Sequence, residues 1–496
     1  MDTKKISLAL TSLTFSYMFY EQTAGINFLI FTLVVISTML IVRPALLNNK
    51  TWLIAVSGSI LSALMIIWQH TMLAIIANGF SLVLLIGLSN HSQSSVYVGL
   101  YKGIGTLMMS FFKVLFEGFD KYIFHQSAKQ KSSFSISKSA AFYVFPLLIT
   151  LVFYFLYASA NPVFQSYFYF SLDIISGKYL LFLGLGIFLS FGFYYQFFSE
   201  SLTEWDVAQP NALVRVKRKV KRHFQLTILK MENTKGIISL TMLNLLILFF
   251  NIVDFSTMFS NQALPNGVNY SEYVHQGVNT LIFSSLLAVS LILYYFRANQ
   301  NFYTNNQWLQ RLSYLWLLQN TILLTGVIFK NQLYITEFGL TYKRIGVYVF
   351  LILSMAGIIT TFWKVQHRKT LWFLFRTNTW FAYSLLVLSS FINWDNAIAQ
   401  YNIHTAKQLD VTYLLNLSDN TLPETKSLLS NSKVNLNTNV YNYTHLKNDN
   451  HASSTPIISQ RAFILLAVKR FEDNYKAKQW QSWNYADEQI FKQISK

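Results

Sequence analysis

Cysteine and charge are what this 496-residue sequence has least of. It contains no cysteine, which excludes disulfide bonds, thiolate metal sites and cysteine nucleophiles. Charged residues make up 12% of the chain, against about 25% in ordinary soluble domains. With 19 glycines and 7 prolines, collagen-like and low-complexity classes are excluded too. A soluble chain of this length would need more polar surface, so the sequence indicates an integral membrane protein.

Long apolar runs are abundant instead, since 53% of the residues are hydrophobic. A helix that crosses a bilayer needs about 17–25 mostly apolar residues. Eleven runs approach or meet this length: Ile6–Tyr20, Gly25–Val42, Trp52–Trp68, Thr71–Leu88, Ala140–Ser159, Tyr179–Phe198, Gly236–Phe259, Gly277–Phe296, Ser313–Phe329, Ile345–Val365 and Leu371–Ile392. The predicted fold class is therefore all-α, a polytopic transmembrane helix bundle of about eleven spans.

Lysine and arginine in the loops set the expected orientation. The formal net charge is +18, and basic residues accumulate in loops on the cytoplasmic side of a membrane. Ser260–Gln276 contains no Lys or Arg, whereas Lys330–Arg344 is a basic exception on the same side. We expect the N-terminus inside and, after eleven spans, the C-terminus outside.

Composition divides the chain into two regions. Residues 1–393 form the predicted transmembrane domain, with a basic cytoplasmic loop at 199–235. Residues 394–496 form a predicted extracytoplasmic helical tail with nearly balanced charge. Within it, the Asn-, Ser- and Thr-rich stretch 431–455 is typical of a flexible loop.

Residues 97–122 are read as an amphipathic helix that lies on the inner membrane surface. Its apolar face contains Leu100, Ile104, Leu107, Met108, Phe111, Leu115 and Phe119, and its polar face contains Lys102, Thr106, Ser110, Lys113 and Glu117. The polar face is expected to meet the cytoplasm.

The loop before the seventh run carries the densest positive charge. Its candidate contacts to anionic phospholipids at the cytoplasmic face are Arg215, Lys217, Arg218, Lys219, Lys221 and Arg222. Each such charge contributes about 1 kcal/mol near an anionic surface. The alternatives are a simple topology anchor or docking of a specific lipid or protein, and nucleic acid is not an expected partner.

Signatures of catalysis are absent. The sequence has no His-Glu-x-x-His, no P-loop and no Gly-x-Ser-x-Gly, and the tail histidines lack the spacing of metal ligands. No cofactor or metal is expected, and no catalytic residue is assigned. Ionisable residues within the spans are scarce, with Asp254 and Arg376 as the main examples, so a proton-relay pump is disfavoured.

Polar segments at the outer ends of four spans form the candidate site. Its members are Asn161, His275, Glu337, Lys343, Arg344 and Asp395. One interpretation is structural, with capped helix ends and Arg344 forked between the carboxylates of Glu337 and Asp395. The other is a ligand or substrate site, because clustered ionisable groups mark both kinds of place.

The same segments carry a resemblance. They are Ala160–Phe164 (ANPVF), Tyr273–Gly277 (YVHQG), Glu337–Arg344 (EFGLTYKR), Asn393–Ala399 (NWDNAIA), Tyr401–Asn402 and Leu409–Ser418 (LDVTYLLNLS). In order and spacing they resemble the bacterial membrane-protein family catalogued as domain of unknown function 4173, with its relative 4153. The resemblance implies a multi-pass protein of the bacterial inner membrane, and it implies no activity, cofactor or catalytic residue.

Three functions stay open. The first is a non-catalytic membrane module that senses or organises protein partners through its outer face and periplasmic tail. The second is a transporter or flippase-like protein for a lipid or amphiphile, and the third is a membrane-embedded transferase on a lipid-linked substrate. A solid bundle with exposed apolar tail surface would favour the module. A continuous polar path would favour the transporter, and an outward cavity lined by Glu337, Asp395 and His275 would favour the enzyme.

Overall fold

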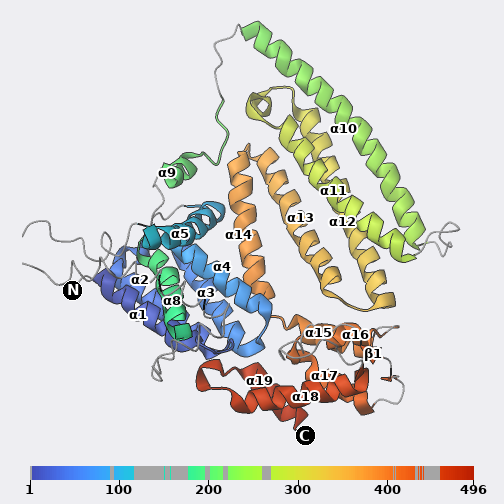
Figure 1. Cartoon of the computed structure of the whole chain (residues 1–496). Coiled ribbons are helices and arrows are strands. Elements are labelled where there is room, and N and C mark those ends of the chain that lie inside the picture. Colours follow the sequence, from blue (N-terminus) through green and yellow to red (C-terminus); the bar gives the residue numbers. More distant parts are fainter. Residues whose placement is uncertain are drawn as a thin grey trace, which may run out of the picture. The chain divides into compact units, whose positions relative to one another are not determined.

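The computed structural model divides into two units, which we describe separately (Figure 1). The first comprises Met1–Asp206 with Lys478–Tyr485, and the second comprises Val207–Ala477 with Ala486–Lys496. The tail predicted as one domain is thus shared between both units. The structure describes residues 3–89, 94–116, 150, 157, 177–195, 201–215, 222–259, 270–405, 407, 409–430, 434, 436–437, 439–440 and 458–495.

The first unit is built from helices that reverse at short capped turns. Its elements are α1 (Thr3–Phe19), α2 (Ile26–Val42), η1 (Pro44–Asn48), α3 (Lys50–Gln69), α4 (Met72–Gly87), α5 (Val96–Phe116), α8 (Gly177–Tyr194), α9 (Ser201–Ala208) and η6 (Trp480–Ser482). The side chain of Asn49 accepts the N–H of Trp52 at the start of α3, and Thr71 does the same for Ala74 at the start of α4. These caps fix where the α3–α4 hairpin turns.

Small residues allow α4 and α5 to approach closely. Gly99 and Gly103 lie four residues apart on α5 and face α4. A Cβ at Gly87 would lie 1.7 Å from the carbonyl oxygen of Gly99, and one at Gly103 would lie 2.3 Å from that of Val83. Lipid tails are as apolar as the side chains, so burial of apolar surface does not drive helices together in a membrane. Close van der Waals packing does, and small residues permit it.

The expected exposure of the polar face of α5 is wrong. Lys102 is 2% exposed and donates to the Thr203 hydroxyl at 2.8 Å, and Thr106 and Ser110 are also buried. Ile104 and Met108, on the apolar side, are exposed. Amphipathic spacing identifies two faces but not which of them meets protein. Here the polar face packs inward, as it does in a helix whose outer surroundings are apolar.

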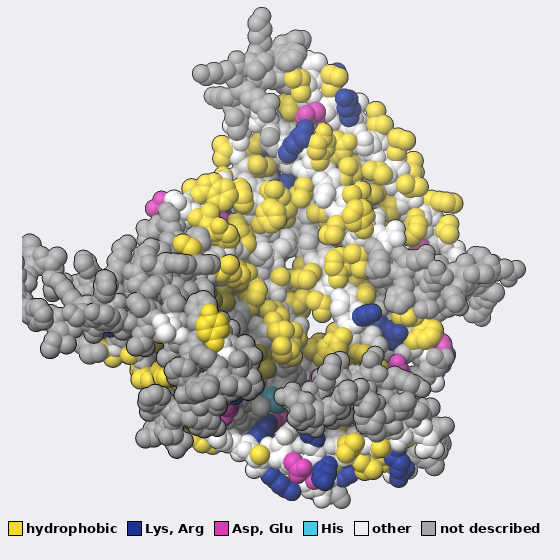
Figure 2. Space-filling view, in the orientation of Figure 1, with side chains coloured by type: hydrophobic (Ala, Val, Ile, Leu, Met, Phe, Trp, Pro, Cys, Tyr) yellow, Lys and Arg dark blue, Asp and Glu magenta, His cyan; other side chains and the backbone are white. Residues whose placement is uncertain are grey.

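The second unit opens with a bundle of five long helices. They are α10 (Arg222–Phe259), α11 (Tyr270–Tyr295), α12 (Gln307–Phe338), α13 (Tyr342–Gln366) and α14 (Leu371–Ser389), with η3 (Ala298–Phe302) before α12. Figure 2 shows hydrophobic side chains covering the visible face of these helices, and basic ones near the start of α10 and over the tail. On α10, Met242, Leu246 and Phe249 are each about two-thirds exposed. Such a surface fits surrounding hydrocarbon, not water.

Ten of the eleven predicted spans coincide with helices of the described chain. Five helices in the described part are long and apolar enough to cross a membrane: Lys50–Gln69, Gly177–Tyr194, Thr227–Thr257, Gln307–Phe338 and Tyr342–Gln366. Shorter apolar helices cover Ile26–Val42, Met72–Gly87 and Thr280–Tyr295. The run Ala140–Ser159 lies outside the described residues, apart from Thr150 and Tyr157. The count of eleven spans and the orientation stay predictions.

The tail of the second unit is helical, as its sequence predicts. It contains α15 (Trp394–His404), α16 (Val411–Leu415), η4 (Asp419–Thr421), α17 (Leu422–Ser427), η5 (Leu428–Ser430), α18 (Gln460–Ala477) and α19 (Tyr485–Ile494). An antiparallel pair, β1 (Asn439–Val440) with β2 (Ile458–Ser459), precedes α18. Phe463, Ile464 and Phe471 of α18 form its core with Ile490 of α19. The predicted loop 431–455 lies mostly outside the described residues.

Candidate functional site at the turn between α12 and α13

The candidate site is built on the three-residue turn, residues 339–341, between α12 and α13. Gly339 takes a φ of 82°, where glycine meets no steric penalty, and its N–H donates to the Ile335 carbonyl at 2.8 Å. Arg344 donates to the carbonyls of Phe338 and Gly339, and its guanidinium lies 4.2 Å from the ring centroid of Tyr334. The expected fork of Arg344 between two carboxylates is therefore wrong. The cation caps the C-terminus of α12, where carbonyls are unsatisfied.

Asp395 links three elements through a buried carboxylate. It lies in the first turn of α15 and is 8% exposed. One oxygen accepts the hydroxyl of Tyr342 from α13 at 2.8 Å, and the other accepts the hydroxyl of Ser418, just before η4. Asp395 thus joins α13, α15 and the segment before η4 by hydrogen bonds from two hydroxyls.

Asn402 of α15 bonds both backbone polar groups of one residue in the turn. Its side-chain oxygen accepts the N–H of Leu340, and its amide donates to the Leu340 carbonyl at 2.9 Å. Beside it, the Tyr413 hydroxyl accepts the N–H of Tyr342 at 3.0 Å. These contacts satisfy backbone groups that the turn leaves open. An apolar cluster of Ile345, Ile398, Ala399 and Leu414 lies beneath them.

The phenol of Tyr413 stays protonated in this setting. Burial raises its pKa, the N–H of Tyr342 opposes that shift, and the charge of Asp395 adds to it. A neutral phenol can accept the backbone N–H and still donate. Sequence reasoning missed Tyr413, Tyr342 and Asn402, although all three lie in the motifs that carry the family resemblance.

The other predicted members of the site divide into described and undescribed residues. Glu337 forms an ion pair with Lys407, with side chains 42% and 61% exposed, and an exposed pair of this kind contributes about 0–1 kcal/mol. Lys343 is exposed. His275 falls within α11, but its side chain lies outside the described part, as does Asn161 altogether. Of the described members, Glu337 lies in the last turn of α12, Arg344 lies in the first turn of α13, and Asp395 bonds Tyr342 of that turn.

A second polar cluster lies inside the bundle, between α10 and α12. Lys330 of α12 forms an ion pair with Asp254 of α10, and their side chains are 6% and 8% exposed. Gln319 donates to the side-chain oxygen of Asn244 at 2.7 Å, and Asn251 donates to the Gln319 carbonyl at 3.2 Å. Lys330 was placed in an outer loop because the apolar run ends at Phe329. No helix breaker follows until Gly339, which is the signal that α12 continues.

Two of the predicted lipid-contact residues lie in the described part of the chain, before and at the start of α10. Arg215 is exposed, and Arg222 begins α10, whereas Lys217, Arg218, Lys219 and Lys221 lie outside the described residues. The segment before Arg215 is fixed to the α13–α14 turn, because Leu213 donates to the Arg368 carbonyl at 2.8 Å. Thr370 in turn donates its N–H to the Asn211 carbonyl at 3.1 Å.

The polar side chains around the turn are held by hydrogen bonds within the protein. Both oxygens of Asp395 are engaged by hydroxyls, and Arg344 is engaged by carbonyls. Among the described residues, no group of three or more His, Asp or Glu side chains could hold a metal ion. The arrangement is that of a joint between bundle and tail.

The comparisons with known proteins place this joint inside a family domain. The family model described as domain of unknown function (DUF4153) matches residues 6–428, from α1 to the end of α17. The match is to the relative 4153 and not to 4173. No curated protein and no solved structure matches the chain. The helices α18 and α19 lie beyond the matched range.

Proposed function

We propose that this chain, which belongs to the DUF4153 family, is a non-catalytic module of the bacterial inner membrane that presents its tail helices to a protein partner. The tail lies on the periplasmic side in this proposal, and the N-terminus lies in the cytoplasm. The apolar exposed faces of α10 and of its neighbours support the membrane setting.

The observation that carries the proposal is the joint at the α12–α13 turn. Asp395, Asn402 and Tyr413 bind the backbone or the side chains of that turn, so tail and bundle are coupled by directed hydrogen bonds. A hydrolytic or transfer site would need an acid or base that can exchange a proton with the substrate. Both oxygens of the buried Asp395 carboxylate accept hydroxyl groups of the protein itself, which fits a structural role.

The tail also offers a surface for a partner. Leu465 and Leu466 of α18 are 53% and 48% exposed, although their neighbours Phe463 and Ile464 are buried in the tail core. The exposed cations Arg461 and Lys469 lie one turn to either side of Leu465. Apolar side chains with a charged rim are typical of a protein contact.

A photocrosslinking amino acid at Leu465 tests the module. We expect one discrete protein adduct in intact cells, and none from the same probe at Lys476, which is also exposed on α18. The replacement of Leu465 and Leu466 by serine should remove an adduct formed from a probe at Lys469. Identical adduct patterns at Leu465 and Lys476 would show that no defined partner surface exists there.

The buried ion pair supports a transporter for a lipid or amphiphile as the second candidate. Lys330 and Asp254 are costly to bury inside an apolar bundle, and such groups often mark a transported charge. A transporter predicts that Lys330→Gln with Asp254→Asn abolishes flux in vesicles while the protein stays folded. The module predicts that the same double variant leaves the Leu465 adduct unchanged.

A further inference from the structure

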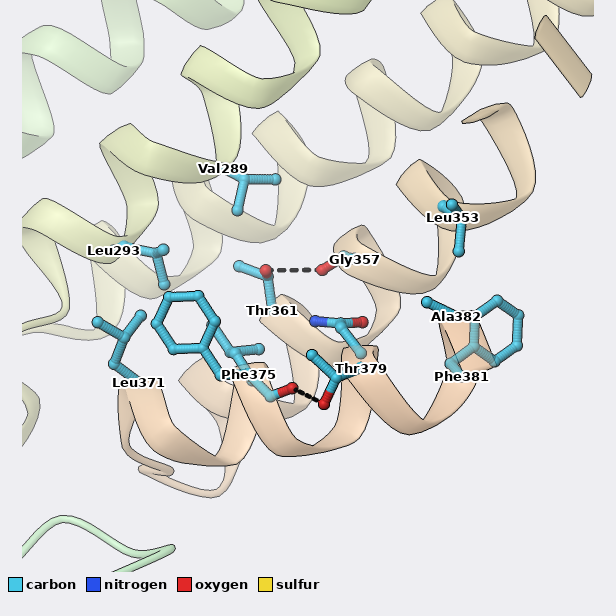
Figure 3. Close-up of a pocket in the computed structure, with 12 residues that line it drawn as sticks. Val289, Leu293, Leu353, Gly357, Thr361, Leu371, Phe375, Thr379, Phe381 and Ala382 are labelled. Carbon is cyan, nitrogen blue, oxygen red and sulfur yellow. Dashed lines mark hydrogen bonds between the residues drawn. The ribbon is translucent and has the colours of Figure 1, made fainter. Parts of the chain in front are cut away.

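A cavity of about 380 Å³ lies among α11, α13 and α14, within the bundle of the second unit (Figure 3). This volume is within the range of about 300–1,000 Å³ that is typical of small-molecule pockets. Leu293, Leu371 and Phe375 gather at one end of it, and Leu353, Phe381 and Ala382 at the other. The cavity is therefore elongated along α14 and mostly hydrocarbon-lined.

The hydroxyl groups in the wall are turned back on their own helices. Thr361 donates to the Gly357 carbonyl at 2.7 Å, and Thr379 donates to the Phe375 carbonyl at 2.7 Å, as the dashed lines in Figure 3 mark. Asn378, the one amide in the wall, exchanges hydrogen bonds with Thr360. The lining carries no charged side chain, so its best complement is an apolar chain and not a polar solute.

Part of the apolar lining is exposed. Leu371, Phe375 and Phe381 line the cavity and are 39–50% exposed. On a helix bundle able to cross a membrane, exposed residues of this kind contact bilayer hydrocarbon. A membrane supplies a phospholipid acyl chain as the apolar occupant that matches this lining.

Positive charge lies at one end of the cavity. Leu371 begins α14, and the turn before it contains Arg368 and Lys369. Arg215 is exposed two residues after Leu213, which is bonded to that same turn. A headgroup above the Leu371 end would thus meet three basic residues, which favour a phosphate.

We propose that the groove between α11, α13 and α14 binds an anionic phospholipid, with one acyl chain between Gly357 and Phe375 and the headgroup at Arg215, Arg368 and Lys369. The sequence interpretation assigned anionic lipid to the basic loop alone and gave no place for a chain. The groove supplies that place and makes the contact specific. The inference goes beyond the proposed module and does not depend on it.

Gly357 provides a direct test, because its missing side chain leaves part of the groove open. A Cβ at Gly357 would have no atom within 4 Å, and the same holds for Gly346 on the same helix, which is not in the groove. Gly357→Phe should fill the cavity without strain. Gly346→Phe adds the same ring to α13 elsewhere and serves as the matched control.

The experiment is native mass spectrometry of the full chain, delipidated in detergent and titrated with phosphatidylglycerol or phosphatidylcholine of equal chain length. We expect one tightly retained phosphatidylglycerol, bound at least tenfold more weakly by Gly357→Phe and unchanged in Gly346→Phe. The double variant Arg368→Gln with Lys369→Gln should remove the preference for phosphatidylglycerol but keep chain binding. Equal retention in both glycine variants would overturn the groove assignment, and equal binding of the two lipids by the wild type would overturn the headgroup assignment.

Discussion

Replacement of Asp395 by asparagine removes one charge from the joint and keeps the shape of the side chain. In the wild type, each carboxylate oxygen accepts one hydroxyl, from Tyr342 and from Ser418. Asparagine retains one accepting oxygen and offers an NH₂ group to the second hydroxyl, which must then rotate to accept. Asp395→Asn should therefore weaken both hydrogen bonds without creating a cavity.

The expected cost follows from the burial of the carboxylate. Hydrogen bonds to a charged group contribute about 1.5–3 kcal/mol each, and neutral ones about 0.5–1.5 kcal/mol. With two bonds affected, the free energy for opening the tail should fall by about 1–3 kcal/mol. Asp395→Leu leaves both hydroxyls without their acceptor and should cost more, while Asp395→Glu should be partly tolerated.

Hydrogen exchange of the α15 and α16 amides in detergent measures this opening directly. A loss of about 1.4 kcal/mol raises the exchange rate of amides protected by the joint about tenfold. Asp419→Asn is the control, because Asp419 pairs with Arg470 at 3.2 Å but is partly exposed. It should change exchange by a factor of about five or less. Equal exchange in the two variants would refute a structural role for the buried carboxylate.

Two further predictions concern groups whose burial the sequence did not indicate. Lys330→Met leaves Asp254 buried without its cation and should cost about 3–5 kcal/mol, whereas Lys330→Met with Asp254→Leu should recover most of this; equal thermal unfolding of single and double variants would contradict the ion pair. In this cysteine-free chain, Lys102→Cys should react with a water-soluble maleimide only after denaturation, whereas Arg215→Cys should react in the native protein. Rapid native labelling at position 102 would restore the interfacial assignment for α5.

The apolar runs predicted the helices well, because a spanning helix is long and its hydrocarbon requirement is strict. Gly339 marks the end of α12. Asn393 caps α15 through its side chain, a helix start that the sequence did not predict. The predicted helix ends were wrong where a helix continues beyond its apolar run. The last turns of α12 carry Lys330 on a buried face, and hydropathy alone cannot separate such a turn from a loop.

Partners within the candidate site could not be predicted for a different reason. Glu337 and Arg344 lie on either side of the α12–α13 turn, and Asp395 bonds Tyr342 beside it. Which donor serves which acceptor depends on the rotation of each helix about its axis. Arg344 lies close enough to the carbonyls of its own turn to cap them, so it does not reach across to carboxylates. The neutral partners Tyr342, Asn402 and Ser418 carry no charge signal that would identify them.

We propose that the bundle holds the tail outside the cytoplasm, and crosslinks between two pairs of cysteines test this proposal. Glu337 and Lys407 form an exposed ion pair at the end of α12, and Glu232 and Arg297 form a similarly exposed pair near its start. Cysteines replace both members of either pair, and intact spheroplasts receive a short bifunctional thiol-reactive reagent that cannot cross the membrane.

We expect rapid crosslinking of Glu337→Cys with Lys407→Cys, and crosslinking of Glu232→Cys with Arg297→Cys only after the cells are broken. The Glu232 pair thus reports the cytoplasmic side under the same chemistry. Crosslinking of the Glu337 pair only in broken cells would contradict the outward tail, and its absence under both conditions would contradict the joint itself.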